Sequence, residues 1–118
     1  SVMSMIRFID GQKFNGRILA VFGALGDKDY GEAYTMLKAR VDFWYLCSLE
    51  GERGQQASQL SRRLFGAAPD AGQIDRIAEF DSPQAAFIAA KSAAQKHDML
   101  LIFGSFHVVG AIIPLLKN

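Results

Sequence analysis

Cysteine is nearly absent from this sequence, which excludes two kinds of stabilisation. Cys47 is the single cysteine among 118 residues, so the chain can form neither an internal disulfide nor a cysteine-rich metal site. Cys47 lies inside the apolar run 43–49, which predicts a buried and unreactive thiol. The two histidines, His97 and His107, are separated in sequence and do not suggest a structural metal site. We therefore expect no bound metal in this chain.

Excess charge and long hydrophobic runs are also missing. The formal net charge is +1, which provides no electrostatic attraction for nucleic acid or an anionic membrane. No apolar stretch approaches the ~20 residues that span a bilayer, and the first residues do not resemble a secretory signal peptide. These absences predict a cytoplasmic protein with no nucleic-acid or membrane partner.

The composition that remains is typical of one packed domain. Half of the residues are hydrophobic and 21% are charged, and a chain of this length buries roughly two-thirds of its unfolded surface. No repeat, linker or low-complexity stretch divides residues 1–118. The segment Val2–Ile9 reads as helix with no strand or cap before it, which suggests a piece of a longer protein.

Strand-like and helix-like segments alternate, as in βαβ units with a mainly parallel sheet. Strands are predicted at 17–23, 42–48 and 98–103, with a weak one near 74–80, and helices at 2–10, 29–40, 55–65, 83–96 and 106–116. The three stronger strands are nearly continuous apolar runs, as expected when helices cover both faces of a sheet. With right-handed crossovers, the pattern predicts an α/β fold, a Rossmann-like three-layer domain with a mainly parallel sheet.

Proline and glycine set the expected limits of several elements. Ser82-Pro83 is a strong helix opening, because serine can cap and proline suits the first helical position. A loop is expected around Gly66, Pro69 and Gly72, and Pro114 should end or kink the last helix.

Two predicted strands end in glycine followed by polar residues, at 23–29 and 104–107. Ligands of open α/β sheets bind at the carboxyl ends of parallel strands, so functional residues are expected here. The turn at Gly23 matches neither G-x-G-x-x-G nor Walker A spacing and does not indicate a phosphate cradle. Either its glycines only let the chain turn and Asp27 or Asp29 caps the next helix, or Lys28 points a cation toward a carboxylate or phosphate while the aspartates hold it.

Ser105, the two histidines and Arg53 are further candidate residues with structural or functional interpretations. Ser105 suits the N-cap of the last helix, and a hydroxyl beside free helical N–H groups can also bind a carboxylate. The motif lacks the second glycine of G-x-S-x-G, which argues against a serine hydrolase. His107 could be a base, a carboxylate contact or a core residue, whereas His97 fits a helix C-terminus. Arg53, in the loop 50–54, is either solvated or a second cation for anion recognition.

Four segments together carry a family resemblance, and their Gly-x-x-x-Asp-Lys-Asp and Gly-Ser-Phe-His elements are the most diagnostic. The segments are 22–30, 41–46, 49–54 and 101–107. In this order they closely resemble the C-terminal domain of bacterial folylpolyglutamate synthase/dihydrofolate synthase, in the Mur ligase superfamily. The resemblance covers nearly the whole chain and implies the Mur ligase C-terminal type of Rossmann-like fold.

The resemblance also implies an activity for a longer enzyme. ATP would phosphorylate a carboxylate of dihydropteroate or a reduced folate, and the amine of L-glutamate would attack the acyl phosphate. Ser105 would help to bind glutamate, and His107 stands where relatives carry His or Tyr, which suits a binding role. Asp27, Lys28 and Asp29 would face the interdomain cleft, whereas the family suggests no role for Arg53.

The sequence lacks other parts of that enzyme. It contains no Asp-x-x-His-Asn-Pro motif, P-loop, magnesium ligands or carbamylated lysine. ATP and Mg²⁺ would therefore bind mainly to a P-loop ATPase domain of the same chain, and the 118 residues alone should be inactive. The alternatives are another Mur-type amino-acid ligase and a non-catalytic Rossmann-like interaction domain. An independent nucleotide-binding domain is disfavoured, because the phosphate-binding fingerprint is missing.

Overall fold

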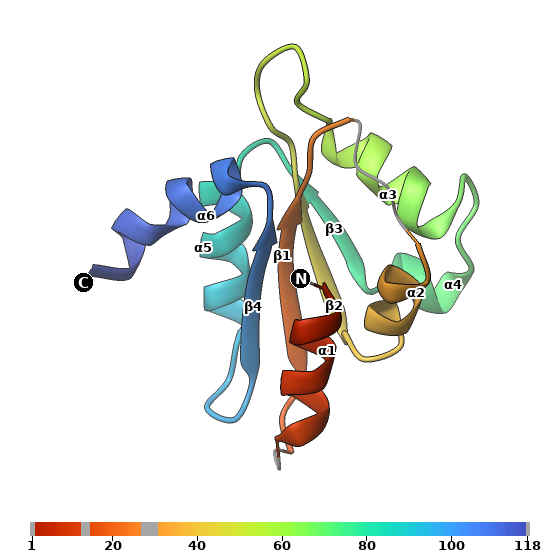
Figure 1. Cartoon of the computed structure of the whole chain (residues 1–118), viewed down its shortest axis with the longest axis vertical. Helices are drawn as coiled ribbons and strands as arrows, with labels where there is room; N and C mark the ends of the chain where they lie inside the picture. The colour runs from red at the N-terminus through yellow and green to blue at the C-terminus, as the bar shows by residue number, and fades with distance from the viewer. Residues whose placement is uncertain (1, 13–14, 27–30, 118) are drawn as a thin grey trace.

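The computed structural model describes residues 2–12, 15–26 and 31–117. The predicted alternation of helices and strands is confirmed (Figure 1). The strands are β1 (Ile18–Gly23), β2 (Phe43–Cys47), β3 (Ile77–Phe80) and β4 (Met99–Gly104). The helices are α1 (Val2–Gly11), α2 (Glu32–Lys38), α3 (Ala57–Phe65), α4 (Ala71–Ile74), α5 (Pro83–Ala93), α6 (Phe106–Ile112) and the 3₁₀ helix η1 (Ile113–Lys117).

The four strands form one parallel sheet in the order β3-β2-β1-β4. β1 is central, with Leu19 beside Phe43 of β2 and Leu100 of β4. All six residues of β1 are buried, which explains why its sequence is a continuous apolar run. The predicted α/β, Rossmann-like three-layer fold is therefore confirmed, with every described strand parallel.

Two hydrophobic cores lie on opposite faces of this sheet. Successive side chains of a strand point to opposite faces, and β1 follows this rule: Ala20 and Phe22 join one core, Leu19 and Val21 the other. The first core includes residues of α1, α2 and α3, and the second includes residues of α5 and α6. In Figure 1, α5 and α6 accordingly lie to the left of the sheet, and α2 and α3 to its right.

Several element boundaries follow the predicted signals. Ser82 caps α5 by accepting a hydrogen bond from the Ala85 N–H at 3.1 Å, and Pro83 is the first helical residue. The regular helix after β4 ends at Ile112, before Pro114, and the chain continues as the 3₁₀ helix η1. The expected effects of Ser82-Pro83 and of Pro114 are thus confirmed.

Three expectations about elements are wrong. The helix predicted at 29–40 begins at Glu32 in the described chain, with Gly31 as its N-cap, and ends at Lys38. The loop expected around residue 72 contains α4, because Asp70 and Gln73 form a reciprocal capping box. His97 is not at a helix C-terminus, since α5 already ends at Ala93.

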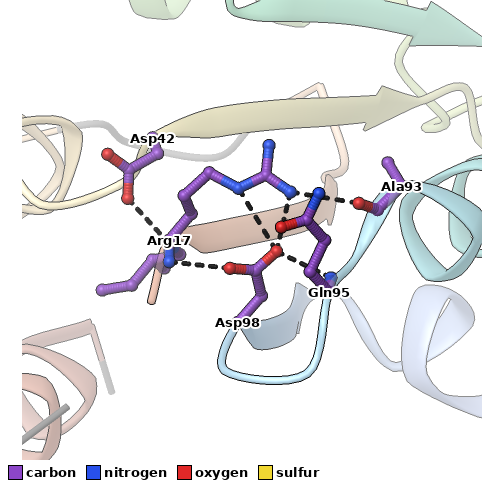
Figure 2. A network of polar contacts seen from close by, with 6 residues as sticks. Arg17, Asp42, Ala93, Gln95 and Asp98 are labelled. Atoms are coloured by element: carbon purple, nitrogen blue, oxygen red, sulfur yellow. Dashed lines mark hydrogen bonds and ion pairs between the residues drawn. The ribbon is translucent and has the colours of Figure 1, made fainter. Parts of the chain in front are cut away.

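A polar network joins the amino ends of the strands, at the edge opposite the candidate site (Figure 2). The Arg17 side chain donates to Asp98 Oδ2, with Nη2 at 2.7 Å, and its backbone N–H donates to Asp98 Oδ1 at 2.9 Å. The Gln95 N–H also donates to Asp98, whose side chain is only 5% exposed. These hydrogen bonds, with that from Arg17 first, hold the pKa of Asp98 well below its usual range. Asp42 accepts from the Ile18 N–H, so β1, β2 and β4 begin at one connected point.

Candidate functional site at the carboxyl edge of the sheet

The carboxyl ends of β1 and β4 lie side by side, because the register pairs Gly23 with Gly104. The Ser105 N–H donates to the Gly23 carbonyl oxygen at 3.1 Å and extends this pairing beyond the strands. The segment after β2 rises above the same edge in Figure 1. The structure therefore brings together the two glycine-containing tips that the sequence singled out.

Glycine is required at both tips for steric reasons. Gly104 has φ +119°, and a Cβ atom there would overlap the Gly23 carbonyl oxygen. A Cβ atom on Gly23 would lie 2.7 Å from Cys47 Sγ and 2.8 Å from a Val108 methyl carbon. The two strand ends can approach this closely only because neither residue has a side chain.

Ser105 is the N-cap of α6, as predicted, but its side chain makes no capping hydrogen bond. Its Oγ atom is buried and has no hydrogen-bond partner within the described chain. A buried hydroxyl left unpaired costs about 1–3 kcal/mol. The hydroxyl therefore has an unused hydrogen-bonding capacity at the carboxyl edge, the part of such sheets where ligands bind.

His107 is an exposed residue of α6, so the core interpretation of this histidine is wrong. It lines a pocket of about 290 Å³ together with residues that follow β2 and β3. Glu50 and Asp81 supply carboxylates to the same pocket. Phe106, between Ser105 and His107, is 94% exposed and leaves an apolar ring at the edge.

Arg53 belongs to a loop that packs on the tip of β1. Leu25 and Gly54 form an antiparallel bridge, and the Gly26 N–H donates to the Arg53 carbonyl oxygen at 2.8 Å. The loop turns at Gly51, which has φ +98°. Its side chains are exposed, as a solvated loop predicts, but its backbone is fixed against β1. Arg53 consequently has a defined place, lining a pocket of about 540 Å³.

Asp27, Lys28 and Asp29 lie outside the described residues, so their predicted roles stay predictions. The described chain flanks them at Gly26 and Gly31. The N-cap of α2 is Gly31, without a side-chain cap, so neither aspartate holds that position.

Sequence reasoning missed the residues that complete the Arg53 pocket. Arg62 and Arg63 of α3, and the buried Gln55, line it. The sequence signal for the two arginines is a pair of basic residues in the last turn of a helix. Such a pattern normally reflects the helix dipole alone. The folded loop 50–54 is what shows that Arg53 lines the same pocket as these two arginines.

The described residues also bear on the sequence expectations for a reactive thiol, a metal site and a membrane-spanning helix. Burial raises the pKa of the Cys47 thiol to about 12, which confirms the predicted inert cysteine. Among the described residues, no three His, Cys, Asp or Glu side chains gather to hold a metal ion. None of the described helices combines the length and apolarity that a membrane crossing requires.

The fold and site define an open parallel α/β domain with its candidate binding surface at the carboxyl edge. The family model described as "Mur ligase, glutamate ligase domain" matches residues 1–106. The chain belongs to this family of ligase domains, which confirms the resemblance seen in the sequence.

Individual relatives agree with the family assignment. The dihydrofolate synthase/folylpolyglutamate synthase of Escherichia coli is 39% identical over 102 residues, covering 86% of this chain and 22% of that protein. The structure of E. coli FolC with DHPP and ADP has a TM-score of 0.82 at 34% identity, over 98% of this chain and 26% of the other. A bifunctional folylpolyglutamate synthase/dihydrofolate synthase with Mn, AMPPNP and L-glutamate bound has a TM-score of 0.77 at 30% identity, with 99% and 26% coverage. The chain thus spans about a quarter of the length of these relatives.

Proposed function

We propose that this chain is the C-terminal domain of an ATP-dependent ligase that adds L-glutamate to dihydropteroate or to folates. In the proposed reaction ATP phosphorylates the acceptor carboxylate, and the glutamate amine displaces phosphate to form an amide. Repeated addition would lengthen a chain of glutamates on the folate. Family membership supports the proposal, as do the ligands named for the related structures, which include DHPP, ADP and L-glutamate.

The unpaired hydroxyl of Ser105 is the observation that carries the proposal for this chain. It is buried at the carboxyl edge and has no partner among the described residues. A carboxylate of glutamate is a strong acceptor that this O–H can satisfy. His107, on the next exposed part of α6, is proposed as a second glutamate contact, and Asp27, Lys28 and Asp29 as contacts from the adjacent tip.

ATP and Mg²⁺ are proposed to bind mainly to a P-loop domain of the same protein. The residues described here do not fit either ligand well, because they form no metal-ligand cluster and the sequence has no P-loop. This chain would bind glutamate, orient its amine and exclude water from the acyl phosphate when the domains close. The 118 residues alone are expected to release no ADP.

The proposal is tested by measuring ADP release by the full-length ligase. The reaction contains ATP, Mg²⁺, L-glutamate and either dihydropteroate or a reduced folate. Release that requires both glutamate and an acceptor is expected, and the preferred acceptor separates the two activities. Release with a different amino acid would indicate another Mur-type ligase. No release with any amino acid would favour a non-catalytic interaction domain.

A further inference from the structure

A pocket at the carboxyl edge lies on the α3 side of β1 and is lined by arginines. Its volume is about 540 Å³. The walls are the tip of β1, the loop after β2 and the outer face of α3. The lining includes Arg53, Arg62, Arg63, Glu52, Gln55 and Gln59. Three guanidinium groups and one carboxylate give the lining an excess of positive charge.

Helix-dipole compensation does not account for the position of Arg63. A basic residue in the last turn serves the dipole by approaching the carbonyl groups at its own helix end. Arg63 instead donates from Nη1 to the Gly26 carbonyl oxygen of the β1 tip at 2.8 Å, and to Gln55 Oε1 at 3.2 Å. This arrangement holds one wall of the pocket against the strand end, near the candidate site.

Arg62 is the arginine best suited to meet a ligand. It is exposed, lines the pocket and makes no ion pair or side-chain hydrogen bond with another described residue. Arg53 is held in the same lining by its loop, whose backbone is bonded to Gly26. The pocket therefore combines fixed walls with the Arg62 guanidinium, which can donate to a carboxylate without first breaking another hydrogen bond.

The lining chemistry suits an extended ligand with several carboxylates. Guanidinium groups bind carboxylates through paired N–H donors. Gln59 accepts from the Gln56 N–H through Oε1, and its Nε2 can donate to a peptide-like carbonyl group between the carboxylates. We propose that this pocket binds the oligoglutamyl tail of the acceptor, while the incoming glutamate binds near Ser105 on the other side of β1. This assignment rests on the proposed function, because only a glutamate-adding ligase would present such a tail here.

The experiment measures binding to the full-length ligase without ATP, so that turnover is not needed. The probes are γ-linked tetraglutamate, free L-glutamate and inorganic pyrophosphate, titrated calorimetrically at low salt. The variants are Arg62→Gln, Arg62→Lys and, as a control with the same charge change, Arg7→Gln on the exposed part of α1.

Tetraglutamate is expected to bind about tenfold more weakly to Arg62→Gln, as for the loss of one charge-assisted contact of ~1.4 kcal/mol. Arg62→Lys should recover part of this affinity, and Arg7→Gln should bind like the parent. The affinity for free L-glutamate should not change with Arg62→Gln. In turnover, the KM for a polyglutamylated folate should rise in that variant, whereas the KM for the monoglutamate should not.

Equal tetraglutamate affinity in the parent and Arg62→Gln would overturn the assignment, as would an equal loss in Arg7→Gln. Tighter binding of pyrophosphate than of tetraglutamate would assign the pocket to phosphate instead. A ligase that binds tetraglutamate through Arg62 but transfers no glutamate would overturn only the proposed function. One that transfers glutamate without dependence on Arg62 would overturn only the pocket assignment.

Discussion

At the scale of single residues, Ser105 links stability to binding. Its buried Oγ atom has no partner in the described chain, so Ser105→Ala removes an unsatisfied polar group. We expect the free energy of unfolding to stay the same or rise by up to about 1 kcal/mol. In the full-length ligase the same change should raise the KM for glutamate more than the KM for ATP, because only glutamate is proposed to contact the hydroxyl.

Ser82→Ala provides the matched control for Ser105→Ala. The Ser82 hydroxyl accepts a hydrogen bond from the Ala85 N–H and caps α5, so its loss should lower stability by about 1 kcal/mol. Urea unfolding of both variants makes the comparison. An equal loss in Ser105→Ala would show that its hydroxyl is already satisfied, and an unchanged glutamate KM would remove it from the binding site.

The site residues differ in how far the sequence could place them. Ser105 was predictable as an N-cap position, because strand, glycine and helix patterns meet there. That its hydroxyl would not cap α6 depends on the side-chain rotamer, which no pattern encodes. Arg53 is recognisable in the sequence as a cation after a strand. That it lines the same pocket as Arg62 depends on the packing of its loop against β1.

At the scale of elements, the junction of β4 and α6 depends on Gly104. Gly104→Ala would place a Cβ atom at φ +119° and against the Gly23 carbonyl oxygen. We expect a loss of at least ~2 kcal/mol of unfolding free energy, from backbone strain and overlap together. Thermal or urea unfolding measures it directly.

Gly110→Ala is the control for this substitution. Gly110 lies within α6, and a Cβ atom there would have no neighbour within 4 Å. Alanine should therefore stabilise the helix by about 0.5–1 kcal/mol relative to glycine. Similar stability of the Gly104 and Gly110 variants would contradict the steric role assigned to the strand tip.

Local sequence signals set several element boundaries, although one of these signals was not recognised. α5 begins where Ser82-Pro83 placed it, because capping and a fixed proline φ are local effects. α4 was missed because four residues are too few for a hydrophobic period, although its Asp70 and Gln73 box is a local signal that was present. α2 begins later than expected because Gly31, not an aspartate, is its N-cap.

At the scale of the whole molecule, the polar network at the amino ends of the strands makes the free energy of unfolding fall at low pH. The pKa of Asp98 is lowered in the folded state, chiefly by the hydrogen bond from Arg17. The carboxylate therefore stabilises the fold fully above its unfolded pKa of about 3.9. This contribution is lost as the pH falls through 4 toward the lower folded pKa.

Urea unfolding between pH 7 and pH 2 tests this dependence. Asp98→Asn should lower stability at pH 7 and flatten the loss below pH 4. Asp10 provides a comparison, because Arg40 also lowers its pKa but its side chain is 50% exposed. Asp10→Asn should have the smaller effect, since solvent screens exposed ion pairs. Equal acid sensitivity of Asp98→Asn and the parent would exclude Asp98 as the cause.

The parallel fold itself was predictable because continuous apolar strands alternate with amphipathic helices. The strand order β3-β2-β1-β4 was not, since a local pattern does not tell which strands become neighbours. The position of the arginine pocket depends on this order, because the loop after β2 meets the tip of β1 only when those strands are adjacent.

The same strand order has a consequence during synthesis on the ribosome. β1 is made first among the strands, yet one of its two neighbours, β4, is made last. Until residue 104 has emerged, the nascent chain holds a central apolar strand with one edge unpaired, which favours association with other chains. The sheet can therefore be completed only after nearly the whole domain has left the exit tunnel. Chaperone dependence should be greatest for ribosome-bound chains that stop between β3 and β4.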